Sequence, residues 1–209
     1  HDHSDDMYDH VLSLGLSHRA KRMYYWDQNE GCTKTETYQI SDTEEMRHRI
    51  LDELNWGALL ATLTSRSSWH QWRAARLFHV DDVPKLDNGE RLPIFLQMTC
   101  FTSYFSHPDR ETLDEALLRL TDGGAVATWG PTSLGLTSGH VRLHNGLVNA
   151  IWGEEPTQIG PATVEARLAL DGQFLSLWDT YALFGDPAMT IYLDPGHTVY
   201  LPLVVRNTN

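Results

Sequence analysis

Short runs of apolar residues recur along the chain, and between them the apolar residues follow helical spacing. Residues 58–64 (ALLATLT) and 93–100 (PIFLQMTC) are largely apolar runs, which is typical of strands buried on both faces of a parallel sheet. Residues 125–130 (AVATWG) predict a third strand of this kind. Shorter strands are predicted at residues 22–26 and 189–193.

Helical segments are predicted between these runs. Ser41 and Glu44 form a capping-box pattern, and the apolar spacing that follows predicts a helix ending at Gly57. Thr112 and Glu115 repeat the capping pattern at the start of a second helix. Two further helices are predicted, at residues 139–152 and 162–170.

The alternation of strands and helices predicts an α/β fold, with a mainly parallel sheet flanked by helices on both faces. Ligands of such sheets bind outside the carboxyl ends of the strands. Residues 63–72 (LTSRSSWHQW) and 98–105 (MTCFTSYF) follow two of these predicted ends. They are therefore the first candidates for a functional site.

Both ends of the chain depart from this pattern. The opening HDHSDD has metal-binding residue types, but no second group of ligands at site spacing supports a metal, and we interpret it as an acidic, poorly ordered start. Because the chain does not begin with Met, we interpret it as a piece of a longer protein. At residues 195–209, prolines and a glycine flank an apolar patch, which predicts a domain edge or linker to a further module.

Composition argues against several classes of function. With 16 Lys+Arg against 28 Asp+Glu, the formal net charge is -12, which disfavours nucleic acid and anionic membranes as partners. No apolar run approaches the ~20 residues that a membrane-spanning helix needs. Two cysteines, Cys32 and Cys100, are too few for the disulfide framework of a small secreted domain.

Three segments carry a resemblance to a known family. They are residues 91–105 (RLPIFLQMTCFTSYF), 112–140 (TLDEALLRLTDGGAVATWGPTSLGLTSGH) and 177–193 (LWDTYALFGDPAMTIYL). Together they resemble the catalytic core of the gingipain-like cysteine peptidases, which are relatives of the caspases. The resemblance implies a caspase-like three-layer sandwich over residues 1–194, as the later part of a catalytic domain whose first strands are missing. It also implies that the N-terminal part of the same domain, or another chain, covers the open sheet edge.

The resemblance also assigns site residues. In the family a cysteine ending one strand is the nucleophile, and a histidine in a Gly-His-Gly turn ending the neighbouring strand is the base. Matched residue by residue, Cys100 is the nucleophile, whereas Ser65, Arg66 and Ser67 stand where the family has Gly, His and Gly. The backbone N–H groups of Ser67 and Cys100 then form the oxyanion hole. Near the cysteine, Ser103 stands where a glycine is common.

Arg66 changes the chemistry open to Cys100. Histidine near neutral pH serves as both base and acid, whereas arginine keeps its proton because its pKa lies above about 12. A guanidinium beside Cys100 favours the thiolate but cannot protonate the leaving amine. Three histidines, His70, His79 and His107, lie close by in the sequence. His70 is the candidate replacement base, and the alternative is that all three are solvated loop residues.

A substrate pocket follows from the same resemblance. Trp129, Thr132, Ser133 and Leu136 come after the third predicted strand, where the family forms the pocket for the side chain before the scissile bond. The alternative is an ordinary loop over the sheet. No cofactor and no metal are implied.

Two functions remain open. The first is a cysteine endopeptidase domain of a secreted bacterial protein, extracellular or on the cell surface, which acts on a peptide or protein substrate through Cys100. The second is a catalytically dead structural or binding module of an extracellular or surface assembly. Three coincident substitutions, at Ser65, Arg66 and Ser67, favour impaired or absent catalysis.

Overall fold

The three buried runs predicted from the sequence form the centre of one sheet. They are β3 (Leu60–Thr64), β7 (Ile94–Met98) and β8 (Ala127–Pro131), which pair in parallel in that order. A fourth strand, β10 (Tyr181–Phe184), pairs antiparallel with β8 and completes the sheet. This computed structural model describes residues 3–16, 20–26, 38–153 and 157–192.

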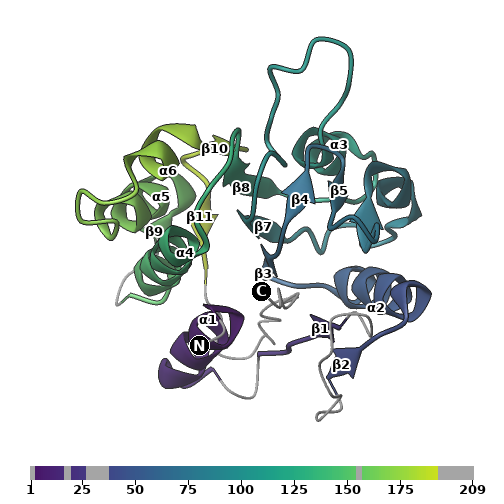
Figure 1. The fold of residues 1–209 in the computed structure, drawn as a ribbon, viewed down its shortest axis with the longest axis horizontal. Coiled ribbons are helices and arrows are strands. Elements are labelled where there is room, and N and C mark those ends of the chain that lie inside the picture. The colour runs from purple at the N-terminus through teal and green to yellow at the C-terminus, as the bar shows by residue number, and fades with distance from the viewer. Residues whose placement is uncertain (1–2, 17–19, 27–37, 154–156, 193–209) are drawn as a thin grey trace.

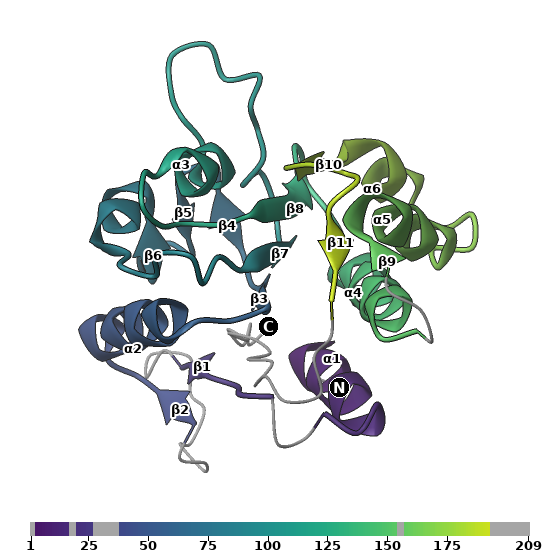
Figure 2. The same cartoon turned by 180° about the vertical axis from the view of Figure 1, so that it is seen from behind.

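Helices cover both faces of this sheet (Figures 1 and 2). One face carries α1 (His3–Ser13), α4 (Thr137–Ile151), α5 (Ile159–Leu168) and α6 (Leu175–Thr180). The other carries α2 (Thr43–Trp56), the 3₁₀ helix η2 (Val80–Lys85) and α3 (Leu113–Arg119). Because side chains alternate along a strand, Ile94 and Trp129 join the core beneath α4, while Leu63 and Phe95 join the core beneath α2. The predicted three-layer α/β arrangement is confirmed.

Two helix starts were predicted from capping boxes, and one of them is wrong. α3 has the box, since the Thr112 side chain accepts from the Glu115 N–H and the Glu115 side chain accepts in return. In α2 the N-cap is Asp42, whose side chain accepts from the Glu45 N–H at 2.7 Å, and not Ser41. The patterns Ser41–Glu44 and Asp42–Glu45 are offset by one residue, and aspartate is as good a cap as serine.

The sequence did not predict α1, α6 and β10, which belong to the main sheet and its helical layers. The expected poorly ordered start is corrected by α1, whose residues Met7 and Val11 are fully buried in the same core as α4. The helix α6 and the strand β10 follow one another without a turn signal between them. Because β10 runs antiparallel to β8, the sheet is mixed at this edge. An antiparallel strand needs no crossover helix before it.

Short strands lie outside the main sheet. They are β1 (Tyr24–Tyr25) with β2 (Gln39–Ile40), β9 (Thr157–Gln158) with β11 (Thr190–Ile191), and the three-stranded set β4 (Ser67–Ser68), β5 (Gln71–Trp72) and β6 (Phe78–His79). The strands predicted at 22–26 and 189–193 are therefore peripheral pairs. Residue 193, Cys32 and the segment 195–209 lie outside the described residues.

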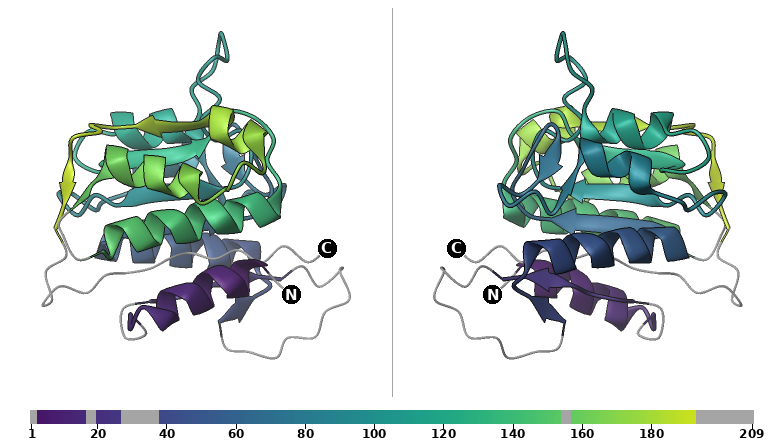
Figure 3. Two further views of the ribbon diagram at one scale, coloured as in Figure 1. Left: turned by 90° about the vertical axis from the view of Figure 1, so that its left-hand side faces the viewer. Right: turned by 90° about the vertical axis from the view of Figure 1, so that its right-hand side faces the viewer.

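Two features of the outline bear on function. The segment between β7 and α3 projects beyond the rest of the molecule (Figures 1 and 3). In the described part of the chain, no strand pairs with the outer edge of β3.

No helix in the described part of the chain combines the length and hydropathy of a membrane span.

Candidate active site

A cavity of about 720 Å³ opens where β3 and β7 end, at the sheet edge predicted to bind ligands. Its walls come from the turn after β3, the turn after β7, the loop from β8 into α4, and the start of α1. It is lined by residues 64–67, 100–101 and 134–137 with His3, Ser4 and His140. The structure therefore brings Cys100 and Arg66 into one cavity.

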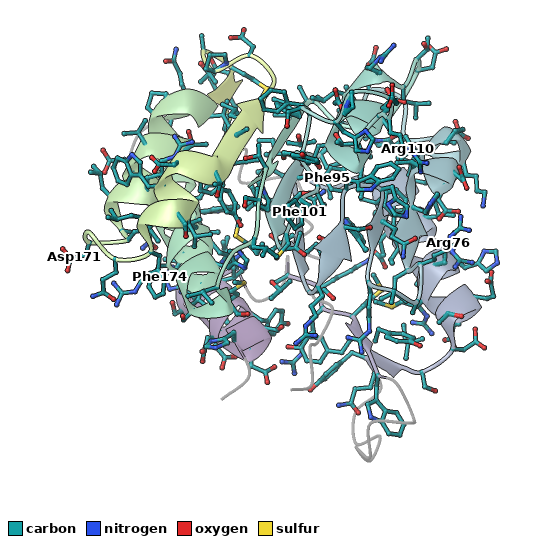
Figure 4. All side chains as sticks on the ribbon, turned by 45° about the horizontal axis from the view of Figure 1, so that its top comes forward. Arg76, Phe95, Phe101, Arg110, Asp171 and Phe174 are labelled. Atoms are coloured by element: carbon teal, nitrogen blue, oxygen red, sulfur yellow. The ribbon has the colours of Figure 1, made fainter. Side chains whose placement is uncertain are left out.

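Cys100 lies two residues beyond β7 as a free, partly buried thiol. Its Sγ is 4.0 Å from the carbonyl oxygen of Gly135, and within the described residues no imidazole hydrogen-bonds to it. The next residue, Phe101, has φ 62, in the left-handed region that non-glycine residues seldom adopt. Its N–H donates to the Ser133 carbonyl at 3.2 Å, which holds this tight turn (Phe101 is labelled in Figure 4). Such backbone strain is concentrated at functional sites.

The Ser67 side chain ties the turn after β3 to the cysteine. The Cys100 N–H donates to Ser67 Oγ at 3.2 Å, and the Ser67 hydroxyl donates to the Cys100 carbonyl. Ser67 Oγ also lies 2.6 Å from Thr99 Oγ1, and Thr99 in turn donates to the Ser65 carbonyl at 2.6 Å. One of the two N–H groups expected to form the oxyanion hole therefore already has an acceptor, which sequence reasoning did not foresee.

The orientation of the second expected donor, the Ser67 N–H, follows from the pairing of β4 with β5. The Arg73 N–H donates to the Arg66 carbonyl at 2.9 Å, which makes these two residues a hydrogen-bonded pair of the β4–β5 hairpin. The next pair, Ser67 and Trp72, is then a non-hydrogen-bonded pair, because the two kinds alternate in antiparallel ladders. The Ser67 N–H consequently points away from β5.

Arg66 is exposed at the cavity mouth. Within the described residues, no carboxylate lies within ion-pairing distance of its guanidinium. The cavity therefore holds a cation that no acid of the described residues neutralises.

His70, the candidate replacement base, is placed elsewhere. Its ring stacks on Trp69 with centroids 4.1 Å apart, and its Nδ1 lies 3.1 Å from Ser68 Oγ. Burial, followed by the charges of His79 and Arg110, holds the pKa of His70 below its ordinary value. His70 does not line the cavity. His107 also packs against the Trp69 ring, with centroids 5.4 Å apart, and His79 caps η2.

Four residues were assigned to the substrate pocket, and one of them, Leu136, lines the cavity. Trp129 is fully buried and packs against Tyr181, with ring centroids 5.0 Å apart. Thr132 donates its hydroxyl to the Thr180 carbonyl at 3.0 Å, and Ser133 contributes its carbonyl to Phe101. These three residues support the cavity wall from behind.

Sequence reasoning missed His140. It lies in the first turn of α4, is 3% exposed, lines the cavity, and its Nε2 has no hydrogen-bond partner in the described structure. Burial lowers its pKa to about 4, so the ring is neutral at physiological pH. The signal was available, because a Gly-His pair begins the helix that follows the third strand. His3 also lines the cavity, from the start of α1.

A buried carboxyl group supports the turn of Cys100 from below. Asp114 is fully buried, and it accepts hydrogen bonds from Gln97 Nε2 at 2.8 Å and from the Ser103 hydroxyl. Ser103 thus has a buried hydrogen-bond partner in Asp114. Burial raises the pKa of Asp114 to about 6, against an ordinary value of 3.8.

We expect Asp114→Asn to remove part of the pH dependence of stability. The folded state holds the Asp114 proton up to about pH 6, so ionisation of this group makes stability fall as pH rises from about 4 to 6. The slope at its steepest is about 1.4 kcal/mol per pH unit. Asparagine does not ionise; its Oδ1 can still accept from Gln97 Nε2, and its Nδ2 can donate to Ser103 Oγ in place of the bond that Ser103 now donates. Urea unfolding of both proteins across this range measures the difference.

The comparison must be made between variants, because His140 and His144 act in the opposite sense. Burial lowers the pKa of each to about 4, so their protonation destabilises the fold as pH falls. The exposed Asp109→Asn serves as the matched control. If the Asp114→Asn and wild-type curves run parallel, Asp114 is not held protonated.

No group of three or more His, Cys, Asp or Glu side chains in the described ranges is arranged to hold a metal ion. The chemistry that the cavity offers is therefore that of its thiol, its guanidinium, its imidazoles and the backbone N–H groups at its rim.

Comparison with known proteins places these observations in a family. The model of peptidase family C25 matches residues 3–192. No curated protein sequence matches the chain significantly.

Solved structures share the fold. The complex of Porphyromonas gingivalis RgpB pro- and mature domains is 22% identical with a TM-score of 0.67, and the match covers 78% of this chain and 41% of that one. The Arg-specific cysteine proteinase gingipain R (RgpB) is 19% identical with a TM-score of 0.71, over 90% of this chain and 42% of the other. The chain thus spans less than half the length of these neighbours. The predicted caspase-like α/β arrangement is confirmed.

Proposed function

Because the chain belongs to peptidase family C25, the gingipain family, we propose that its cavity is a cysteine-peptidase site in which Cys100 is the nucleophile and peptide hydrolysis is impaired or lost. The observation that carries the proposal is that Cys100 and Arg66 line one cavity and that no imidazole of the described residues is hydrogen-bonded to the thiol. The position of Cys100 at a strand end, followed by the strained Phe101, supports its role as nucleophile.

The missing step is proton transfer. Hydrolysis of an amide needs a group that removes the thiol proton and later delivers a proton to the leaving amine. The Arg66 guanidinium stays protonated at working pH and does neither. An alkylating reagent needs no proton for its leaving group, so Cys100 can react with small electrophiles without this step. Loss of a general acid–base alone lowers the rate by about 10²–10⁴-fold.

Ser67 adds a second defect. An oxyanion hole works when its N–H groups are free to meet the developing negative oxygen. The Cys100 N–H already donates to Ser67 Oγ, so a substrate must displace that hydroxyl before it can use the donor. The loss of one such donor costs about 10²–10³-fold in rate.

A second candidate function is that of a structural or binding module in an extracellular or surface assembly. The outer edge of β3, unpaired within the described residues, favours it, because buried strands rarely leave such an edge uncovered. We propose that the N-terminal part of the same domain, or another chain, pairs with this edge. The secreted location that the family implies is part of the same proposal.

Alkylation tests whether Cys100 is the thiol of a peptidase-type cavity. We expect iodoacetamide to modify Cys100 in the folded protein, as read by peptide mass mapping, because this free, partly buried cysteine lines the cavity. Cys32→Ala leaves one thiol and Cys100→Ala leaves the other, so the two variants identify the modified residue. A Cys100 that reacts only after unfolding means a buried, inert thiol and refutes the proposal.

A further inference from the structure

The cavity around Cys100 is lined without acidic residues of the described chain, although the protein as a whole is acidic. The protein carries 28 Asp+Glu against 16 Lys+Arg, yet no Asp or Glu is among the described residues that line the cavity. The ionisable groups there are Cys100, Arg66, His3 and His140. The nearest acids to the α1 wall are already engaged, since Asp6 lies 3.7 Å from His3 and Asp5 lies 3.6 Å from Arg22.

The start of α4 adds backbone donors to this wall. α4 is 15 residues long and begins at Thr137, which lines the cavity; its N-cap, Leu136, makes no side-chain hydrogen bond, and its first turn contains no acid. The N–H groups of Gly139 and His140 reach back to the Leu136 carbonyl, at 3.0 and 3.1 Å. The N–H groups of Thr137 and Ser138 have no acceptor among the described residues, and the positive end of the helix dipole favours an anion.

His140 supplies an independent sign of a missing ligand. Its side chain is buried, and its Nε2 lacks a partner in the described structure, which leaves a polar atom without its usual compensation. The Nε2 end of the ring faces Gly135, where an added Cβ would approach to 2.3 Å. Gly135 also lines the cavity and receives the contact from Cys100 Sγ. The unpaired nitrogen is thus directed at the wall beside the thiol.

We propose that this cavity binds the side-chain carboxylate of an acidic residue in an extended peptide, held by Arg66, the start of α4 and His140. The proposal rests on the proposed function in one respect, because Cys100 marks the bond that follows the acidic residue. A basic side chain finds no carboxylate to pair with in the described cavity, in contrast to what the Arg-specific neighbour's name describes for that protein.

Affinity labelling tests the preference without any need for turnover. Three peptidyl chloromethyl ketones differ only in the last residue, which is Glu, Gln or Lys. The Cys100 sulfur displaces chloride, so a carbon–sulfur bond forms, the carbon–chlorine bond breaks and the thiol proton passes to buffer. We expect Glu to label at least about tenfold faster than Gln, and Gln faster than Lys, because a charge-assisted contact of about 1.4 kcal/mol corresponds to that ratio. Intact-protein mass spectrometry gives the rates.

Variants assign the preference to the proposed groups. Arg66→Gln and Thr137→Asp should each bring the Glu-to-Gln ratio toward one, while Thr137→Asn keeps it. Thr137→Asp places a favourable residue at a helix start, so folding is preserved. His140→Gln retains an amide donor near Nε2 and should keep the preference that His140→Leu loses.

Competition separates the two sources of a carboxylate. A capped peptide amide ending in Glu should protect Cys100 from the Glu reagent, and a peptide ending in Gly with a free C-terminus should not. Protection by the free C-terminus alone, equal rates for all three reagents, or faster labelling by Lys would each overturn the proposal. If iodoacetamide also leaves Cys100 unmodified, the proposed function itself fails; if iodoacetamide labels Cys100 normally, the acidic preference alone is refuted.

Discussion

The triple substitution Ser65→Gly, Arg66→His and Ser67→Gly is expected to raise peptide hydrolysis by more than about 10⁴-fold over the wild-type chain, because the restored general acid–base contributes about 10²–10⁴ and the freed N–H a further factor of about 10²–10³. Histidine restores a group that accepts the Cys100 proton and returns it to the leaving amine. The glycines restore backbone freedom on both sides of the base and remove the hydroxyl from the Cys100 N–H. Release of a fluorophore from a mixture of short peptide amides, at neutral pH, measures the gain.

The same triple variant with Cys100→Ala is the control, because hydrolysis that survives this change does not come from the cavity. Thermal unfolding of each variant shows whether the turn after β3 still folds. A triple variant that folds like the wild type and remains inert contradicts the idea that this turn holds the decisive defects.

Ser67→Gly should contribute its own factor of about 10²–10³ to that gain, in addition to the factor from the histidine. With Ser65→Gly and Arg66→His in place, Ser67→Gly frees the Cys100 N–H that now donates to Ser67 Oγ at 3.2 Å. The comparison of kcat for Ser and Gly at this position gives the cost of the occupied donor directly.

Two further substitutions at position 67 distinguish the effect of the hydroxyl from the effect on backbone freedom. Ser67→Ala removes the acceptor and keeps the side chain's restriction on backbone angles, so it should approach the rate of Gly. Ser67→Thr keeps a hydroxyl and should stay near the rate of Ser. Equal rates for all four residues would show that the hydroxyl is displaced by substrate at no cost.

The main sheet could be predicted because its strands are buried on both faces. The runs that became β3, β7 and β8 consist mostly of apolar residues, and this pattern has few alternatives at such lengths. α1 was harder to predict, because its first turn is acidic and few of its residues, among them Met7 and Val11, are buried. β10 follows α6 directly, and an antiparallel edge strand cannot be distinguished from a continued helix by four residues.

Some features of the candidate site could be predicted from the sequence, and others could not. The meeting of Cys100 and Arg66 follows from topology, since parallel neighbouring strands end at the same edge. The Ser67 hydroxyl bond depends on a rotamer, which spacing does not determine. His140 is more than thirty residues from the cysteine and reaches the cavity through the crossover from β8 into α4, whereas His70, near in sequence, is drawn to Trp69. Trp129 points into the core because it shares the strand face of Ala127.

The most direct test of the central claim is Cys100-dependent hydrolysis by the wild-type chain. The wild type and Cys100→Ala are incubated with the same mixture of peptides, which includes sequences with acidic residues, and new termini are identified by mass spectrometry. The account predicts that the two proteins give the same products at the same negligible rates, although iodoacetamide modifies Cys100 in the wild type. Cleavage that appears in the wild type and disappears in Cys100→Ala would show a working proton shuttle in the cavity and contradict the account.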